Sequence, residues 1–369
     1  MRYLFTFLLF LSYSASFGCY NEYYALDAKG HFHQVDVGMI RFQINFDQQK
    51  IERKLIQLGK KLQTKADFKV LSDYGLYLVK GGKVKEARVI FEALAKAYPN
   101  EYSIIANLGT TYELLGENEK ALEYIRKGLK LNPNSHGGSE WIHVKILLTK
   151  IGFSKDLNYL KEHDGLELTP KQKASKAVRE QLHIQLKERF PFCKGPDPIM
   201  ADLFIDLGDC YAESISFEHA KGLYQIAKKY YNTDRQDVDE KIERVRKLRS
   251  RYSDSIPHST SGETEFGMVS KISGVPYESY LEDPNSDNYA INWSKIETDP
   301  DKLLAFLDLK RIEEEQKTLE PRKIEKPAPK EKVKSSPKKE SDISILLLSF
   351  TLVTLIVAIF TYFKTRKRK

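Results

Sequence analysis

The sequence lacks the short motifs that mark several common enzyme classes. It contains no His-Glu-x-x-His metal motif, no Gly-x-Ser-x-Gly serine motif and no glycine-rich loop for a phosphate. Cys193 and His183 are the residue types of a nucleophile and base, but neither lies in a recognisable catalytic context. His31 and His33 share one face of an expected strand with no further ligand at useful spacing, which favours surface histidines over a metal site. These absences predict a protein that is not an enzyme and has no cofactor, no metal and no small-molecule substrate.

A basic surface of the kind that binds nucleic acid is also missing. The formal charge is +8, from 59 basic and 51 acidic residues. Six of the basic residues are Arg2 and the cations at 364–369, which leaves 53 against 51. The segment 310–340 holds four further net positive charges, so the remainder is slightly acidic. No basic stripe with interleaved aromatic residues occurs, and we therefore expect no nucleic-acid partner.

What the sequence does contain, between Phe68 and Ser135, is one pattern of 34 residues written twice. The landmark pairs are Leu71 with Ile105, Tyr74 with Leu108, Gly75 with Gly109, Leu78 with Tyr112, Ala87 with Ala121, Phe91 with Ile125, Leu94 with Gly128 and Pro99 with Pro133. This period, with a Leu-Gly pair, a following aromatic residue, a later Ala and a closing Pro, resembles the tetratricopeptide repeat (TPR).

Each copy has the pattern of two packed helices. In the second copy Ile105, Leu108 and Tyr112 lie three or four residues apart, as on one face of a helix. Gly109 has no side chain, so a second helix can approach closely there, and Pro133 stops that second helix. One helix pair cannot bury its own apolar faces, and copies must therefore stack.

The resemblance implies an all-α fold, a TPR-like solenoid of helical hairpins over residues 48–252. A helix over 48–66 is expected to cover the open end of the first repeat, and the period becomes irregular over 136–200. The clear repeats are 68–101, 102–135 and 201–234. The residues that define them are Gly75, Ala87, Pro99, Leu108, Gly109, Tyr112, Ala121, Pro133, Gly208, Tyr211 and Ala220.

The N-terminal part differs in character from the repeats. Residues 1–18 combine one positive charge, an apolar run and a small-residue stretch, which predicts a signal peptide. Cleavage before Cys19 leaves open whether that cysteine is lipidated. Over 19–47, two short apolar runs flank Asp-Ala-Lys-Gly and predict a small β-hairpin, followed by alternating Phe42, Ile44 and Phe46.

The C-terminal part predicts a membrane anchor. Residues 253–309 are irregular in composition, and 310–342 form a Lys/Glu/Pro spacer that cannot bury a core. Residues 343–363 carry no charge and are long enough, at about 1.5 Å per residue, for a transmembrane helix. The basic tail 364–369 indicates a cytoplasmic end, so the bulk of the chain is expected outside the cytoplasm, in the periplasm if the source is bacterial. This organisation resembles that of membrane-anchored, bacterial-type TPR proteins.

The chain has three cysteines, and the expected compartment permits disulfides. Cys193 and Cys210 are close enough in sequence to form one, which would stabilise the fold by about 3 kcal/mol on the chain-entropy model. The alternative is that Cys210 is a small residue buried against the preceding helix.

The resemblance implies that the concave face of the solenoid binds protein or peptide partners. By repeat position, the groove is expected to include Lys69, Ser72, Leu76, Val79, Ser103, Ala106, Thr110, Glu113, Asp202, Ile205 and Asp209. Some family members hold a C-terminal carboxylate with a lysine and asparagine clamp, but here only Lys69 occupies such a place. The leading interpretation is a membrane-anchored TPR scaffold on the extracytoplasmic side. The alternatives are a structural subunit of a permanent envelope complex and, more remotely, an enzyme within 253–309.

Overall fold

The computed structural model describes residues 24–26, 32–34, 40–252, 276–309 and 312. The chain divides into two units, 1–317 and 318–369, and all described residues belong to the first. The expected signal peptide (1–18), Cys19, the spacer except for one residue, the expected transmembrane span (343–363) and the basic tail lie outside the described residues. Among the helices that are described, none combines the length and the apolar character needed to cross a membrane.

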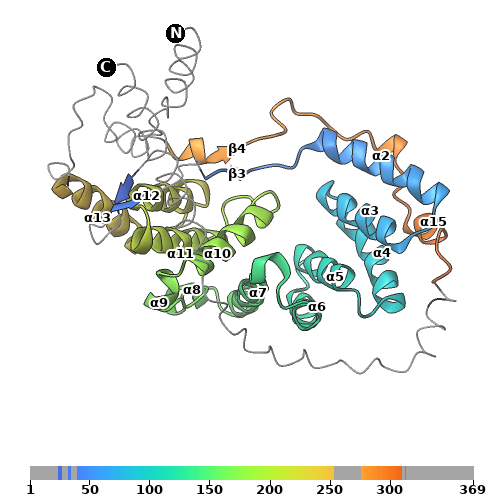
Figure 1. The fold of residues 1–369 in the computed structure, drawn as a ribbon, viewed down its shortest axis with the longest axis horizontal. Helices are drawn as coiled ribbons and strands as arrows, with labels where there is room; N and C mark the ends of the chain where they lie inside the picture. The colour runs from blue at the N-terminus through green and yellow to red at the C-terminus, as the bar shows by residue number, and fades with distance from the viewer. Residues whose placement is uncertain (1–23, 27–31, 35–39, 253–275, 310–311, 313–369) are drawn as a thin grey trace, which may run out of the picture. The chain divides into compact units, whose positions relative to one another are not determined.

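The first helices stack in sequence order, each against the next (Figure 1). They are α2 (Gln48–Thr64), α3 (Phe68–Lys80), α4 (Val84–Ala97), α5 (Tyr102–Leu114) and α6 (Asn118–Leu131). Asp47 and Asp67 begin α2 and α3 by accepting hydrogen bonds from backbone N–H groups of the first turn. Gly82 and Gly116 follow the first helix of each hairpin with φ of +87° and +79°, which glycine adopts without strain.

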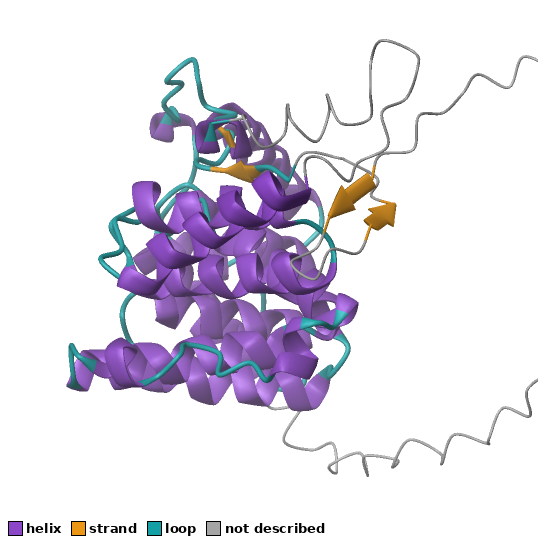
Figure 2. Cartoon of the chain, turned by 90° about the vertical axis from the view of Figure 1, so that its left-hand side faces the viewer, coloured by secondary structure: helices purple, strands orange, loops and turns teal. Residues whose placement is uncertain are grey.

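The array continues through longer and less regular helices. They are η1 (Ser135–Gly138), α7 (Glu140–Lys155), α8 (Tyr159–Glu162), α9 (Pro170–Lys173), α10 (Lys176–Arg189), α11 (Pro198–Ser214), α12 (Phe217–Gln225), the π-helical turn η2 (Ile226–Tyr230) and α13 (Gln236–Tyr252). Seen from the side, the helices lie in stacked rows (Figure 2). The helical architecture expected of a TPR solenoid is therefore confirmed for the described residues.

Three glycines set the spacing of three hairpins. A Cβ atom at Gly75 would lie 2.9 Å from Phe91 Cζ, and one at Gly109 would lie 2.7 Å from Ile125 Cδ1. A Cβ at Gly208 of α11 would overlap the ring of Tyr224 in α12 in the same way. The separation in sequence between glycine and contact is the same in all three pairs. Hence α3/α4, α5/α6 and α11/α12 share one packing geometry, in which the missing side chain admits the facing helix.

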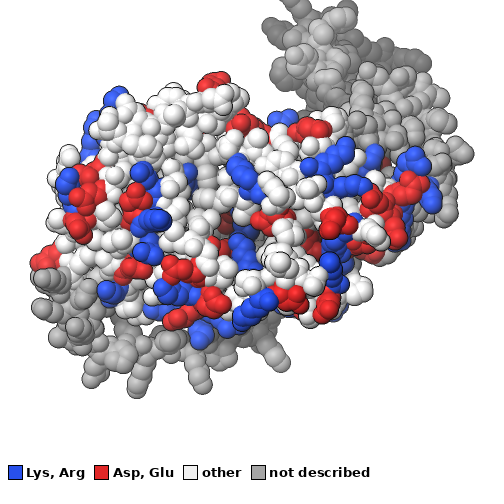
Figure 3. Space-filling view, turned by 180° about the vertical axis from the view of Figure 1, so that it is seen from behind, with Lys and Arg blue, Asp and Glu red and all other residues white. Residues whose placement is uncertain are grey.

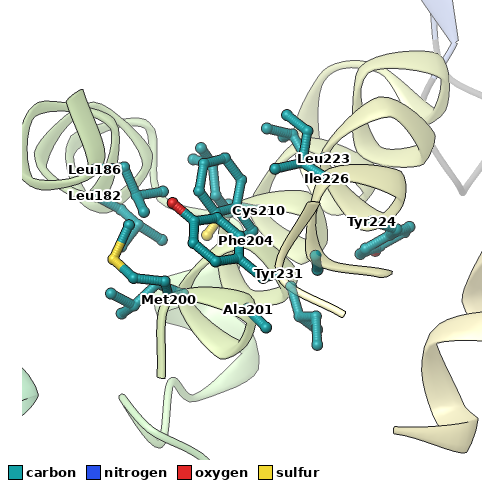
Figure 4. Close-up of a cluster of buried hydrophobic side chains, with 14 of the residues drawn as sticks. Leu182, Leu186, Met200, Ala201, Phe204, Cys210, Leu223, Tyr224, Ile226 and Tyr231 are labelled. Carbon is teal, nitrogen blue, oxygen red and sulfur yellow. The ribbon is translucent and has the colours of Figure 1, made fainter. Parts of the chain in front are cut away.

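Two apolar cores lie along the array. The first joins α2 to α6 and includes the fully buried Leu71, Phe91 and Ile105. The second joins the helices from α7 to α13, where Phe204 and Tyr231 pack against residues of α10 and α12 (Figure 4). On the face seen in Figure 3, acidic and basic side chains are interspersed, without an extended field of one sign.

Short strands precede and follow the helices. β1 (Tyr24–Leu26) pairs antiparallel with β2 (Phe32–Gln34), in agreement with the predicted hairpin. His33 lies in β2, whereas His31 is outside the described residues. β3 (Phe42–Gln43) pairs in parallel with β4 (Leu281–Glu282), so two segments far apart in sequence run together at the edge of the array (Figure 1).

The part of 253–309 that is described is ordered against the helices, which its irregular composition did not predict. It contains η4 (Tyr277–Tyr280), β4, η5 (Trp293–Lys295) and α15 (Pro300–Leu304). The backbone N–H of Asn292 donates to Glu52 at 2.8 Å, and Tyr74 Oη donates to the carbonyl of Glu297 at 2.7 Å. Leu303 is buried with α2–α4 residues. We call residues 281–309 the C-terminal strap.

The disulfide suggested by the sequence is not formed. Cys193 and Cys210 are both free thiols in the structure. Cys210 is fully buried in the second core on α11, among apolar side chains (Figure 4), whereas Cys193 is only partly buried in the loop after α10. The alternative interpretation, that Cys210 is a small packed residue, agrees with this environment.

Candidate functional site: a cavity on the inner face of the array

A cavity of about 380 Å³ lies between the inner faces of α3, α5, α7 and α10. We call it the central cavity. All four helices are labelled in Figure 1. Its lining comprises Gln43, Phe46, Leu76, Val79, Lys80, Phe91, Ala106, Asn107, Thr110, Thr111, Glu113, Leu114, Ile125, His136, Glu140, His143, Lys150, Gln185, Lys187, Glu188, Arg189, Pro191, Phe192 and Cys193.

One wall of the central cavity is mainly apolar. Leu76 and Val79 come from α3, and Ala106 comes from α5. Phe46, which precedes α2, and Phe192, which follows α10, meet edge to face with ring centroids 4.7 Å apart. Two segments that are far apart in sequence thus form one aromatic rim.

A second wall is ionic and is organised around Glu113. This carboxylate accepts hydrogen bonds from Arg189 Nη1 at 2.6 Å and Lys150 Nζ at 2.8 Å, and it contacts His143 Nε2 at 2.7 Å. Its side chain is only 3% exposed. Burial opposes ionisation, but Arg189, His143 and Lys150 outweigh it and hold the pKa of Glu113 well below its ordinary value. Glu113 therefore stays negative and neutralises cations that would otherwise be buried alone.

The polar contacts extend from Glu113 to η1. His143 Nδ1 lies 3.5 Å from Glu140, and Tyr102 Oη donates to Glu140 at 3.3 Å. His136 Nδ1 lies 2.8 Å from Glu188, and this hydrogen bond raises the pKa of His136. The three carboxylates of the wall are thus each engaged by groups of the protein itself.

Some cationic groups of the central cavity are not matched in this way. Within the described residues, neither Lys80 nor Lys187 forms an ion pair with an acidic side chain. Lys80 instead lies over the rings of Phe46 and Tyr77, at 5.8 and 5.2 Å from their centroids. Burial and the charge of Lys50 lower the pKa of Lys80, and the charge of Glu188 opposes this shift. Arg189 has a buried Nε with no hydrogen-bond partner among the described residues. In the part of the chain that the structure describes, the cavity therefore contains lysines outside any salt bridge and one N–H donor without an acceptor.

Comparisons with known proteins identify the two helical hairpins that contain α3 and α5. A family model described as tetratricopeptide repeat matches residues 103–135, and a second with the same description matches residues 70–101. These two hairpins are tetratricopeptide repeats.

A curated relative matches a short part of the chain. The Protein CTR9 homolog of Arabidopsis thaliana is 42% identical over 59 residues, which are 16% of this chain and 5% of that protein. The chain therefore covers only a small part of that relative. These matches support the repeats, and the bacterial-type, membrane-anchored organisation stays a prediction from the sequence.

Five of the groove residues expected from the TPR positions line the central cavity. They are Leu76, Val79, Ala106, Thr110 and Glu113. The first two repeats therefore present their first helices to the cavity, as the resemblance implied. Glu113 differs from the expectation in one respect, because its carboxylate is already occupied by three groups of the protein.

The other expected groove residues lie elsewhere. Lys69 and Ser103 are exposed and do not line the cavity, whereas Ser72 is buried inside the first core. Asp202, Ile205 and Asp209 of α11 are also buried.

The reason is that α11 is covered by its neighbours. Asp202 accepts from the Gly165 N–H at 2.6 Å and pairs with Arg235. Asp209 pairs with Lys173 and with Lys241, each at 2.6 Å. The irregular helices before and after α11 cover Asp202 and Ile205, whereas Asp209 lines a second cavity of about 290 Å³ together with Lys173 and Lys241.

The ionic wall was not predicted from the sequence. Its residues lie on η1, α7 and α10, in the region where the repeat period becomes irregular. One signal was available, since His143 and Lys150 lie seven residues apart on one face of α7. That spacing indicates a polar stripe but does not reveal its partner Glu113.

A separate acidic cluster deserves comparison with metal sites. Carboxylate oxygens of Asp164, Asp202 and Asp206 lie within 4.8 Å of one another. Arg235 pairs with Asp202, and Lys173 Nζ lies 4.0 Å from Asp206. These cations already supply countercharge, so the cluster by itself does not indicate a bound metal.

Proposed function

We propose that this protein is a non-catalytic, membrane-anchored TPR scaffold that binds a segment of a partner protein in the central cavity. The observation that carries the proposal is the central cavity itself, which lies against the first helices of two TPRs. TPR arrays use such inner surfaces for protein recognition. The volume of the cavity suits a few side chains of a bound segment rather than a folded domain.

The non-catalytic part of the proposal rests on how the polar groups are used. Glu113, Glu140 and Glu188 are held in contacts with histidines and cations of the same wall. Cys193 lines the cavity, but burial raises the pKa of its thiol, which disfavours the reactive thiolate. These contacts fit a rigid binding surface better than a reaction centre.

The membrane part of the proposal rests on the sequence alone. The uncharged residues 343–363 and the basic tail 364–369 favour a single span with the repeats on the extracytoplasmic side. The charged segment 310–342 would then act as a tether between repeats and membrane.

The cavity is tested by two substitutions on one helix. Thr110→Trp should fill the central cavity, whereas Ser103→Trp places the same side chain on an exposed position of α5 outside it. Crosslinking followed by affinity purification of the full-length chain should recover partners with wild type and Ser103→Trp, and lose them with Thr110→Trp. Equal recovery with both variants would contradict binding in the cavity. Partners that survive high salt with both variants would instead favour a permanent structural subunit.

A further inference from the structure

We infer that the central cavity selects partner segments in which an acidic side chain stands beside an apolar one. This inference deepens the proposed function and rests on it. It concerns an internal acidic residue recognised by α3 and α10, and it does not involve a clamp for a C-terminal carboxylate.

The first argument is the balance of positive and negative side chains in the lining of the cavity. The cavity is lined by the cations Lys80, Lys150, Lys187 and Arg189, by the histidines His136 and His143, and by the carboxylates Glu113, Glu140 and Glu188. Glu113 is shared by Arg189, Lys150 and His143. Glu188 is engaged by His136. Among the described residues, Lys187 has no carboxylate in a salt bridge, and Lys80 forms none either, although the charge of Glu188 acts on it.

The second argument is a donor that lacks an acceptor. Arg189 uses Nη1 for Glu113, and its buried Nε has no hydrogen-bond partner within the described part of the chain. Leaving such a donor unpaired costs free energy. A carboxylate entering the cavity would present acceptors to Arg189 and Lys187, which follow one another closely at the end of α10.

The third argument is the apolar part of the lining. Leu76, Val79 and the rings of Phe46 and Phe192 offer contacts to an apolar side chain. These groups adjoin the cations, because Lys80 lies over the Phe46 ring at 5.8 Å from its centroid. An acidic side chain bound at Lys80 would therefore leave room for an apolar side chain beside it.

A basic segment fits the same cavity poorly. Its cation would face Lys80, Lys150 and Lys187, while Glu113 and Glu140 are buried and paired and the half-exposed Glu188 already contacts His136. Bringing like charges together in a partly desolvated site opposes binding. Charge complementarity thus selects one class of partner segment.

The experiment uses the full-length chain in a mild detergent and an array of nine-residue synthetic peptides. Each peptide has random flanks and a fixed central residue, which is Glu, Gln, Lys or Leu. We expect the protein to be retained about tenfold more by Glu-centred than by Lys-centred peptides, corresponding to about 1.4 kcal/mol. Retained Glu-centred peptides should be enriched in an apolar residue next to the Glu.

Three variants locate the effect. Lys187→Glu reverses an exposed charge at the cavity, and Lys80→Met removes the other unmatched charge while keeping side-chain length. Lys69→Glu is the control, because it reverses an exposed lysine on α3 outside the cavity. The first two should abolish the preference for Glu, and the control should retain it.

The outcomes separate this inference from the proposed function. Peptides that bind without acidic preference, yet are lost with Thr110→Trp, would overturn the inference and leave the proposed function standing. An acidic preference unchanged by Lys187→Glu and Lys80→Met would place the acidic contact elsewhere and also overturn it. The absence of any peptide binding would count against both.

Discussion

At the scale of single residues, the ionic wall depends on one buried carboxylate. Glu113 neutralises Arg189 and Lys150 and contacts His143, with all three distances below 3 Å. Removing one member of a buried ionic group leaves its partners buried and uncompensated, which is more costly than losing an exposed pair. The wall is therefore expected to be sensitive to substitution at this position.

Replacing Glu113 with glutamine should lower the free energy of unfolding by about 3 kcal/mol. The glutamine keeps the shape but supplies no negative charge for Arg189 and Lys150. Urea denaturation followed by circular dichroism measures the change. Glu188→Gln is the matched control, because Glu188 is half-exposed and its pairing with His136 should contribute at most about 1 kcal/mol. Equal effects of the two substitutions would contradict the central role of Glu113.

A second residue-scale prediction concerns pH. Burial, with the charges of Asp164 and Asp202, raises the pKa of Asp206 well above its ordinary value of 3.8. Burial likewise raises the pKa of Asp202 to about 6, despite its pairing with Arg235. The folded protein therefore holds protons that the unfolded chain has released. Their contribution to stability is complete below pH 3.8 and is lost as the pH rises through about 6 and above.

Asp206→Asn should consequently stabilise the protein at pH 7.5 by about 1 kcal/mol or more, since one pKa unit corresponds to about 1.4 kcal/mol. At pH 4 the same substitution should have little effect, because the carboxyl group is then protonated. Thermal unfolding at the two pH values provides the measurement. Asp209→Asn is the contrasting variant. Burial opposes ionisation of Asp209, but Lys241 and Lys173 outweigh it and lower the pKa of this carboxyl group. Removing its charge should therefore destabilise the protein at pH 7.5. Destabilisation by Asp206→Asn at neutral pH would refute the interpretation.

At the scale of helices, the glycine contacts explain why the repeat pattern specifies hairpins. Gly109→Ala should destabilise the protein by roughly 1 to 3 kcal/mol, since the new Cβ would press on Ile125 and on its backbone N. Gly128→Ala is a matched control on α6, where a Cβ would meet Tyr102 and Ala106 at ordinary distances of 3.6 Å and beyond. The control should be neutral or stabilising, because alanine is the better helix former by about 1 kcal/mol. Thermal melts in which the two variants behave alike would argue against this packing.

The sequence predicted the elements whose signals are local. The 34-residue period and the positions of Gly75 and Gly109 can be recognised within single hairpins. The first two repeats, and the five groove residues on α3 and α5, could therefore be predicted from the sequence. The pattern also suggested the β1–β2 hairpin, whose strands lie close together in the sequence. Signals of this kind need no knowledge of distant segments.

The features that escaped prediction depend on contacts between distant segments. The parallel pairing of Phe42 with Leu281, and the hydrogen bond from Asn292 to Glu52, join residues more than two hundred positions apart. Trp293 packs against Gly81, and nothing in the sequence around it indicated this contact. The ionic wall escaped for the same reason, since Arg189 meets Glu113 only after the irregular helices have folded.

At the scale of the whole molecule, the orientation in the membrane is a prediction from the two ends of the chain. A reporter enzyme that works only outside the cytoplasm should be active when fused after Ser335 and inactive when fused after Lys369. The reason is the uncharged stretch 343–363 followed by five cations. Activity of the second fusion alone would reverse the assigned orientation, and activity of both would exclude a single span between the two positions.

The central claim is that partners bind in the central cavity, and site-specific photo-crosslinking tests it most directly. A photo-reactive amino acid replaces Thr110, which lines the cavity, or Ser103, which is exposed on the same helix outside it. After irradiation in the cells that produce the full-length chain, the account predicts a specific crosslinked band from position 110 and none from position 103. The band from position 110 should disappear when Leu76→Trp also fills the cavity. A band from position 103 alone, or one from position 110 that persists with Leu76→Trp, would contradict binding in the cavity.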